Sequence, residues 1–114
     1  MKIYLAIPYT GVEEESFKLA NKMAVEVMKD NHIVYSPVSH NHIMAEEYKL
    51  PADWEYWKEA CISFLEWCDE LWVVNEDIEL VSKSIGVQAE IKIAIVTREV
   101  NKAAFISMVL QLYQ

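Results

Sequence analysis

The sequence of 114 residues predicts an α/β fold in which a parallel sheet of about four strands lies between helices. Short, β-branched apolar runs, typical of buried strands, alternate along the chain with longer segments whose apolar residues recur at helical spacing. Only two glycines and three prolines occur, and no repeat or low-complexity segment interrupts the alternation. Strands that alternate with helices favour right-handed βαβ units. We therefore expect a small Rossmann-like or flavodoxin-like three-layer sandwich, with residues 1–114 forming one domain.

The first half of the chain contains two predicted strands, one predicted helix and a polar loop. Residues 2–7 form a short apolar run that stops at a turn, which is the pattern of a strand. Thr10 and Glu13 have the spacing of a capping box, and the apolar residues after them recur at helical intervals up to the next strand. Residues 33–38 predict that second strand. Residues 39–51 are polar and without a steady period, so we expect a loop of functional length that could hold one helical turn.

The second half repeats the alternation. A helix is predicted over residues 53–68, with the aspartate at its start as the N-cap, and residues 70–74 predict a third strand. A second polar loop over residues 75–84 leads into an apolar-striped helix from about residue 86 to residue 99. Residues 103–110 predict a fourth strand. In such sheets ligands bind beyond the carboxyl ends of the strands, so the polar segments that follow the strands are the candidate binding loops.

The charge balance excludes one class of partner. Eighteen acidic residues against ten basic ones give a net charge of −8, and Arg98 is the only arginine. Proteins that bind the phosphate backbone of DNA or RNA rely on clustered lysine and arginine, which this chain lacks. A small nucleoside or nucleotide stays possible, because helix N-termini and hydroxyl groups can hold it without a basic patch.

Three further features indicate the cellular compartment of the protein. The longest uncharged apolar run, residues 103–112, is shorter than the roughly 20 residues that cross a bilayer, so we expect no integral membrane segment. The apolar stretch at the amino terminus is too short for a secretory signal. Cys61 and Cys68 are about 10 Å apart along a helix, too far to form a disulfide with each other. A cytoplasmic protein with reduced, buried thiols is expected.

Glu90 is the most informative acidic residue. It shares a helical stripe with Val87, Ile91 and Ala94, and no lysine or arginine stands three or four residues away. A carboxylate on an apolar stripe is costly to bury and needs a partner or a function. Position alone leaves two interpretations open: a nucleophile or general base one turn inside a helix, or a glutamate at the edge of the stripe that reaches solvent.

The segment around Glu90 resembles a known signature. Residues 84–91 read Ser-Ile-Gly-Val-Gln-Ala-Glu-Ile, followed by Ala94, and resemble the serine, glycine and glutamate signature of the nucleoside 2-deoxyribosyltransferase-like superfamily, which includes deoxynucleoside monophosphate N-glycosidases. Tyr4 matches the tyrosine that this superfamily places beside its glutamate. The resemblance is closest to a bacterial and phage branch of the superfamily and extends along nearly the whole chain. The matching segments are residues 4–9, 36–42, 50–57 and 69–74.

The resemblance implies an N-glycosidase or 2-deoxyribosyltransferase that cleaves the base–sugar bond of a nucleoside or nucleoside 5′-monophosphate. Glu90 would attack the anomeric carbon and Tyr4 would orient it by a hydrogen bond. Ser84, with Gly86 and the backbone amides near it, would bind a sugar hydroxyl or a 5′-phosphate. No cofactor and no metal is implied. The partner would be the small-molecule substrate, and a homo-oligomer is expected because the superfamily commonly completes its site with a neighbouring subunit.

Other residues are expected around the substrate. By the resemblance, His40 and His42 would lie over the ligand pocket. Pro8 and Tyr9, which follow the first strand, and Asp53 are further candidates for substrate binding. Trp57 could stack on the base, or it could pack in the core or at a subunit interface.

The chain departs from the superfamily at three places. Where relatives often carry a Gly-Trp pair before the serine, this chain has the acid-rich residues 75–83. Cys61 stands where relatives carry an aspartate that engages the leaving base or the sugar, and a thiol cannot copy the two acceptor oxygens of a carboxylate. Asp53 or a loop acid could substitute for it. The monophosphate glycosidases place a serine and an arginine where this chain has Pro8 and Thr10. Free nucleosides are therefore comparable candidates as substrates.

Several alternatives stay open on the sequence alone. The chain could be a non-catalytic nucleoside-binding module of the same fold, or an interaction protein whose tryptophans mediate assembly. Ser84 could serve simply as a helix N-cap, and Tyr4 as a core tyrosine. His40 and His42 could hold a metal if their backbone is extended, although two histidines without a third ligand more often make loop hydrogen bonds.

Overall fold

The computed structural model describes residues 1–74, 77–101 and 105–109, with side chains over residues 1–74 and 77–96. Its elements follow in the order β1 (Lys2–Ala6), α1 (Glu13–Lys29), β2 (Ile33–Tyr35), α2 (Pro37–Tyr48), α3 (Trp54–Trp67), β3 (Glu70–Val74), α4 (Ile78–Lys83), α5 (Ile85–Asn101) and β4 (Phe105–Val109).

The strands form one sheet with the order β2-β1-β3-β4, and every pair is parallel. The chain leaves β1 first toward β2 and later crosses back to β3 on the other side of β1. The strand order therefore reverses between β1 and β3. The prediction of a parallel α/β fold of the small Rossmann-like type is confirmed.

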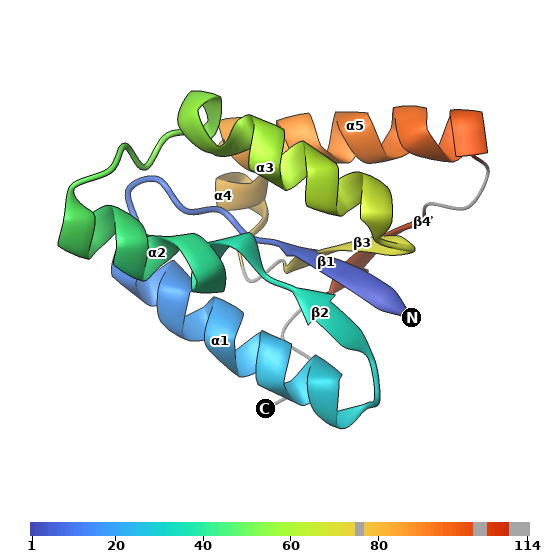
Figure 1. The fold of residues 1–114 in the computed structure, drawn as a ribbon, viewed down its shortest axis with the longest axis horizontal. Helices are drawn as coiled ribbons and strands as arrows, with labels where there is room; N and C mark the ends of the chain where they lie inside the picture. The colour runs from blue at the N-terminus through green and yellow to red at the C-terminus, as the bar shows by residue number, and fades with distance from the viewer. Residues whose placement is uncertain (75–76, 102–104, 110–114) are drawn as a thin grey trace.

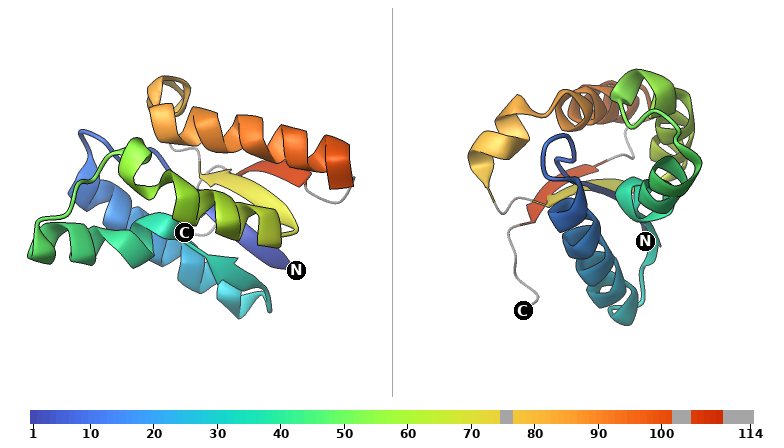
Figure 2. Two further views of the ribbon diagram at one scale, coloured as in Figure 1. Left: turned by 45° about the horizontal axis from the view of Figure 1, so that its top comes forward. Right: turned by 90° about the vertical axis from the view of Figure 1, so that its left-hand side faces the viewer.

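Helices cover both faces of the sheet. Figure 1 shows α3 and α5 side by side above the sheet and α1 below it, and Figure 2 shows the same layers from the end of the sheet. The face toward α1 buries Ile3 and Leu5 of β1 against Met23 and Val27 of the helix. The other face buries Tyr4 and Ala6 together with residues of α3 and α5.

The alternation within β1 places one tyrosine on the face that carries α5. Successive side chains of a strand point to opposite faces, so Ile3 and Leu5 face α1 while Tyr4 faces the helices on the other side. Tyr4 is fully buried. The apolar run that identifies β1 in the sequence therefore also directs a phenol toward α5.

The capping box predicted at Thr10 is wrong. Helix α1 begins at Glu13 after Val12, and no side chain caps it. The Glu13 carboxylate instead accepts a hydrogen bond from the backbone N–H of Gly11 at 2.8 Å. Gly11 has a φ of +88°, a backbone conformation that favours glycine, so the turn after β1 is longer than the capping pattern assumes.

The loop predicted over residues 39–51 is a helix over most of its length. Helix α2 has no clear apolar stripe, which is why periodicity does not reveal it. Its start is nevertheless marked in the sequence, because Pro37 occupies its first turn, where proline is favoured, and Lys49 ends it in a left-handed conformation. This helix also shortens β2, which ends at Tyr35 rather than at residue 38.

The second polar loop, predicted over residues 75–84, also contains a helix. Helix α4 is short, and the Asp77 carboxylate caps it by accepting hydrogen bonds from the backbone N–H groups of Glu79 and Leu80. An aspartate before a short apolar stretch is the signal that could have identified it. Residues 75–76 of this predicted loop lie outside the described residues.

The remaining elements lie close to their predicted bounds. β3 spans the predicted residues, α5 exceeds its predicted helix at both ends, and β4 lies within its predicted segment. Asp53 stands at the N-cap position of α3, although its side chain makes no capping hydrogen bond. Cys61 and Cys68 are both free and buried. Among the described helices, none combines the length and apolar character needed to cross a bilayer.

Candidate functional site

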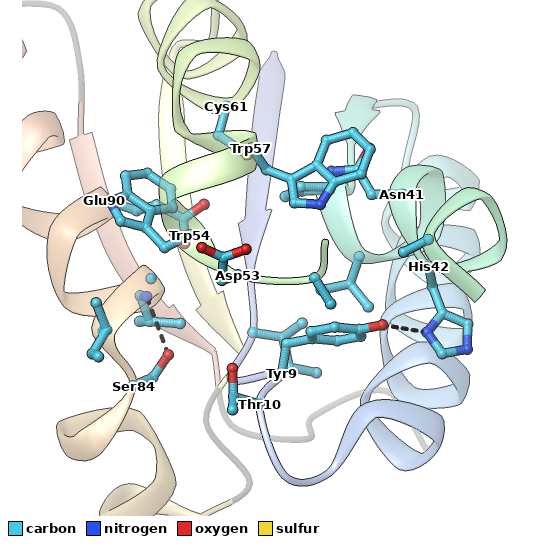
Figure 3. Close-up of a pocket in the computed structure, with 18 of the residues that line it drawn as sticks. Tyr9, Thr10, Asn41, His42, Asp53, Trp54, Trp57, Cys61, Ser84 and Glu90 are labelled. Carbon is cyan, nitrogen blue, oxygen red and sulfur yellow. Dashed lines mark hydrogen bonds between the residues drawn. The ribbon is translucent and has the colours of Figure 1, made fainter. Parts of the chain in front are cut away.

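A cavity of about 470 Å³ lies beyond the carboxyl end of β1, between α2, the start of α3 and the start of α5 (Figure 3). This is where ligands bind in sheets whose strand order reverses. Residues from segments far apart in the chain meet in its wall. The predicted site residues that line it are Tyr9, His42, Asp53, Trp57, Ser84, Gly86 and Glu90.

Glu90 and Tyr4 form a buried pair at the base of this cavity. The Tyr4 hydroxyl, from β1, donates a hydrogen bond to Oε2 of Glu90, from α5. Glu90 is 5% exposed and Tyr4 does not line the cavity itself. Glu90 therefore does not reach solvent at the edge of its stripe, and that interpretation is wrong. The residue is buried and forms part of the cavity wall.

Burial changes the acidity of both groups. Loss of water around the carboxyl group raises the pKa of Glu90 to about 8, while the hydrogen bond from Tyr4 acts in the opposite direction. Burial and the charge of Glu90 hold the pKa of Tyr4 well above its usual value. At neutral pH the unliganded protein therefore carries Glu90 mainly as a neutral acid, with a proton that it can release in the physiological range.

Cys61 lies next to this pair on α3 and forms part of the cavity wall. Burial raises the pKa of its thiol to about 11, so the thiol stays neutral. A neutral thiol is a weak hydrogen-bond donor and cannot take the charge role of the aspartate that it replaces.

The start of α5 forms one side of the cavity. The hydroxyl oxygen of Ser84 accepts a hydrogen bond from the backbone N–H of Val87 at 3.2 Å, so Ser84 caps the helix. This matches the N-cap alternative and leaves Ser84 on the cavity wall. A Cβ atom added at Gly86 would lie 3.7 Å from Trp54, an ordinary contact, so crowding does not require glycine here.

Asp53 and Trp57, from the start of α3, reach over the cavity. In Figure 3 the Asp53 carboxylate points into the space between Trp54 and Tyr9. The indole N–H of Trp57 donates to the carbonyl of Pro51 at 2.7 Å, which fixes the orientation of its ring beside the cavity. The cavity thus offers one carboxylate at its centre and an aromatic plane at its wall.

Tyr9 and His42 close the opposite side. The Tyr9 hydroxyl and Nδ1 of His42 lie 2.6 Å apart, and Nε2 of His42 lies 3.4 Å from Oε2 of Glu14. The imidazole stacks on Phe17, with ring centroids 4.4 Å apart. His42 is buried and belongs to α2, not to a loop.

Two predicted site residues lie away from the cavity. His40 is exposed on α2, where its Nδ1 donates to Oδ1 of Asn41 at 2.6 Å. Pro8 lines a different, smaller hollow beside α1, and its carbonyl accepts a hydrogen bond from Ser16.

The metal alternative also fails on geometry. His40 and His42 stand two positions apart on a helix, and such residues do not face each other. Over residues 1–74 and 77–96, no three histidine, cysteine, aspartate or glutamate side chains gather as ligands for a metal ion.

Sequence reasoning missed several residues of this region, among them Asn41 and Glu14. Asn41 lines the cavity, and Glu14 contacts His42 from α1. Glu14 and His42 are separated by 28 positions in the chain, so no local spacing could reveal their contact. The polar run after β2 was the available signal for Asn41.

Comparisons with known proteins agree with this architecture. Among solved structures, a 2-deoxyribosyltransferase from the psychrotolerant bacterium Bacillus psychrosaccharolyticus is similar, with a TM-score of 0.54 and 20% sequence identity; the match covers 100% of this chain and 77% of that chain. At this identity the similarity shows a shared fold. The comparison with curated proteins found no match. A sequence family described as "Domain of unknown function (DUF1937)" matches residues 1–105, and this chain belongs to that family.

Proposed function

We propose that this protein cleaves the base–sugar bond of a nucleoside, as an N-glycosidase or a 2-deoxyribosyltransferase, with Glu90 as the nucleophile. The observation that carries the proposal is the buried carboxyl group of Glu90, held by the Tyr4 hydroxyl at the wall of a cavity at the strand-order reversal. The shared fold with a 2-deoxyribosyltransferase supports it. The motifs quoted above also favour the bacterial and phage branch of that superfamily.

The chemistry follows from the properties of a carboxylate. An ionised Glu90 oxygen attacks the anomeric carbon while the bond to the base breaks, which gives a glycosyl ester on Glu90 and a free base. A carboxylate stabilises the positive charge that develops on the sugar and can also leave again. Water then releases the sugar, or a second base takes it and forms a new nucleoside. Tyr4 fixes the position of the carboxyl group during both steps.

The charges around the cavity favour an uncharged substrate. Asp53, Glu55 and Glu90 contribute carboxyl groups, and among the described residues that line the cavity there is no lysine or arginine. A 5′-phosphate would lie beside these carboxyl groups without a positively charged side chain to balance it. We therefore propose a free nucleoside, rather than a nucleoside 5′-monophosphate, as the substrate.

Chromatographic detection of free base tests this function. The protein is incubated with a panel of ribo- and deoxyribonucleosides and their 5′-monophosphates, with and without a second free base as acceptor. We expect base release from at least one nucleoside, and turnover of its monophosphate slower by about tenfold or more. A new nucleoside in the acceptor samples identifies a transferase, and its absence a hydrolase.

Two results would overturn parts of the proposal. Faster turnover of monophosphates contradicts the assignment of an uncharged substrate. No base release from any compound, together with a melting temperature that a nucleoside still raises, favours the non-catalytic binding module. The observation that favours this alternative is Cys61, which stands where the superfamily has an aspartate.

Asp53 is the proposed substitute for that aspartate. Its carboxylate points into the cavity and can accept hydrogen bonds from the sugar or the base. We expect Asp53→Asn to lower kcat/KM by about tenfold to 100-fold, because an amide loses the charge and one acceptor oxygen. Glu59→Gln, a substitution of an exposed acid on the same helix, serves as the control. Full turnover by Asp53→Asn would remove Asp53 from the site.

Assembly is a separate proposal. We infer a homo-oligomer, supported by the exposed aromatic side chains of α3, Tyr56, Phe64 and Trp67. Native mass spectrometry at micromolar concentration that finds only a monomer would contradict it.

A further inference from the structure

A chain of polar side chains in contact connects solvent to the cavity on the side away from Glu90. Its inner end is the Tyr9 hydroxyl, which lies 2.6 Å from Nδ1 of His42. Its outer end is Glu14, whose Oε2 lies 3.4 Å from Nε2 of the same imidazole. The His42 side chain is 5% exposed and the Glu14 side chain 63% exposed. A buried imidazole thus links a solvated carboxylate to a phenol that lines the cavity.

The imidazole is held so that each nitrogen keeps its partner. Phe17 stacks on one face of the His42 ring, with an angle of 25° between the planes. The ring of Tyr9 meets it edge-on, at a centroid distance of 5.6 Å. Because these contacts restrict rotation of the ring, Nε2 stays directed at Glu14 and Nδ1 at Tyr9.

The partners determine where the protons of this chain lie. An ionised Glu14 carboxylate can only accept a hydrogen bond, so its position beside Nε2 of His42 favours a hydrogen on that nitrogen in the neutral ring as well as in the charged ring. In the charged ring Nδ1 also carries a hydrogen and donates it to the Tyr9 oxygen. The O–H of Tyr9 is then free to donate into the cavity.

A proton is needed at this place if the proposed function holds. When the bond to the sugar breaks, the bonding electrons pass to the base, and a base leaves far more readily when one of its ring nitrogens is protonated at the same time. Cys61, which replaces the superfamily's aspartate, is a weak donor. Figure 3 shows Glu90 and Ser84 on one side of the cavity and the Tyr9 hydroxyl with His42 on the other. A nucleoside whose sugar lies at Glu90 would extend its base toward Tyr9.

We propose that Tyr9 is the general acid that protonates the departing base, and that His42 and Glu14 position Tyr9 and supply its proton. This inference rests on the proposed function. As Glu90 bonds to the anomeric carbon and the base leaves, the base takes the hydroxyl proton of Tyr9, and Tyr9 takes the Nδ1 proton of His42. The products are the glycosyl ester, a neutral base and a neutral His42, with Tyr9 unchanged. In the transfer direction an incoming base returns its proton along the same path.

The proton count of the site is compatible with this step. The reacting state has Glu90 ionised and His42 charged. It holds the same number of protons as a state in which Glu90 is the neutral acid and His42 is the neutral ring. Substrate binding can therefore select the reacting state without exchange of a proton with solvent.

The test compares two substrates with the same sugar but different leaving groups. One is the nucleoside that the wild type cleaves, and the other is the 4-nitrophenyl glycoside, whose phenolate leaves without a proton. We expect Tyr9→Phe and His42→Gln to lower kcat/KM for the nucleoside by about 100-fold or more and for the aryl glycoside by less than about threefold. Glu14→Gln should lower only the nucleoside reaction, by about tenfold. Tyr48→Phe, at an exposed tyrosine of α2, is the matched control.

The outcomes separate this inference from the proposed function. Equal losses on both substrates would show that Tyr9 and His42 only shape the cavity, and unchanged rates on both would show that they take no part; either result overturns the inference. A wild type that cleaves neither substrate refutes the proposed function, and the inference falls with it. A selective loss on the nucleoside supports both.

Discussion

Replacing Glu90 with glutamine is expected to lower base release by at least about 1000-fold while the protein stays folded. The amide keeps the shape of the side chain and can still accept a hydrogen bond from Tyr4, but it has no ionised oxygen to attack the anomeric carbon. The measurement is initial-rate chromatography of the free base. Glu66→Gln, at an exposed glutamate of α3, is the control and should match the wild type.

A second variant separates the loss of a nucleophile from the loss of a positioning group. Glu90→Ala opens space at the cavity wall, and added azide can attack the anomeric carbon in place of the missing carboxylate. We expect azide to restore base release and to give a glycosyl azide product. If Glu90→Gln retained more than about a tenth of the wild-type rate, Glu90 would not be the nucleophile.

The same glutamate should make the stability of the protein fall as the pH rises. The pKa of Glu90 is 4.5 in an unfolded chain and about 8 in the folded protein, where burial disfavours the charged form. Between these values the folded state binds more protons than the unfolded state. The stabilisation by the raised pKa is therefore complete below pH 4.5 and is lost as the pH rises through about 8.

Glu90→Gln removes this dependence, because an amide does not titrate. Each pKa unit corresponds to about 1.4 kcal/mol, which sets an upper limit on the effect. We expect the free energy of unfolding of the variant to gain on the order of 3 kcal/mol relative to the wild type between pH 5 and pH 9. Urea unfolding at several pH values measures the difference. Parallel profiles for the two proteins would show that the carboxyl group ionises without cost in the folded state. Glu66→Gln should keep the wild-type slope.

The elements with a strong local pattern could be predicted from the sequence. β1 and β3 are short apolar runs, and α1, α3 and α5 have apolar stripes, so burial determines both their type and their position. Helix α2 lacks such a stripe, and its prediction as a loop failed because its start is marked only by Pro37 and its packing comes from α1.

The candidate site could be predicted only in part. The contact between Tyr4 and Glu90 spans 86 positions and was anticipated through a resemblance, not through any local rule. Tyr9 and His42 both lie in quoted motifs, but the motifs imply no contact between them, and the two residues are 33 positions apart. Because α2 was not predicted, the sequence did not show that His40 and His42 leave the helix in different directions. Both were expected over the pocket, and only His42 lines the cavity.

The distance in sequence between Tyr4 and Glu90 has a consequence for synthesis of the protein. Tyr4 belongs to β1 and leaves the ribosome well before Glu90, which belongs to the last described helix. A nascent or truncated chain that ends before α5 therefore carries the phenol without its acid, and the face of β1 and α3 that α5 covers stays open to water. Such a fragment would expose apolar surface to other chains, so the completed site and protection against aggregation arise together when α5 docks.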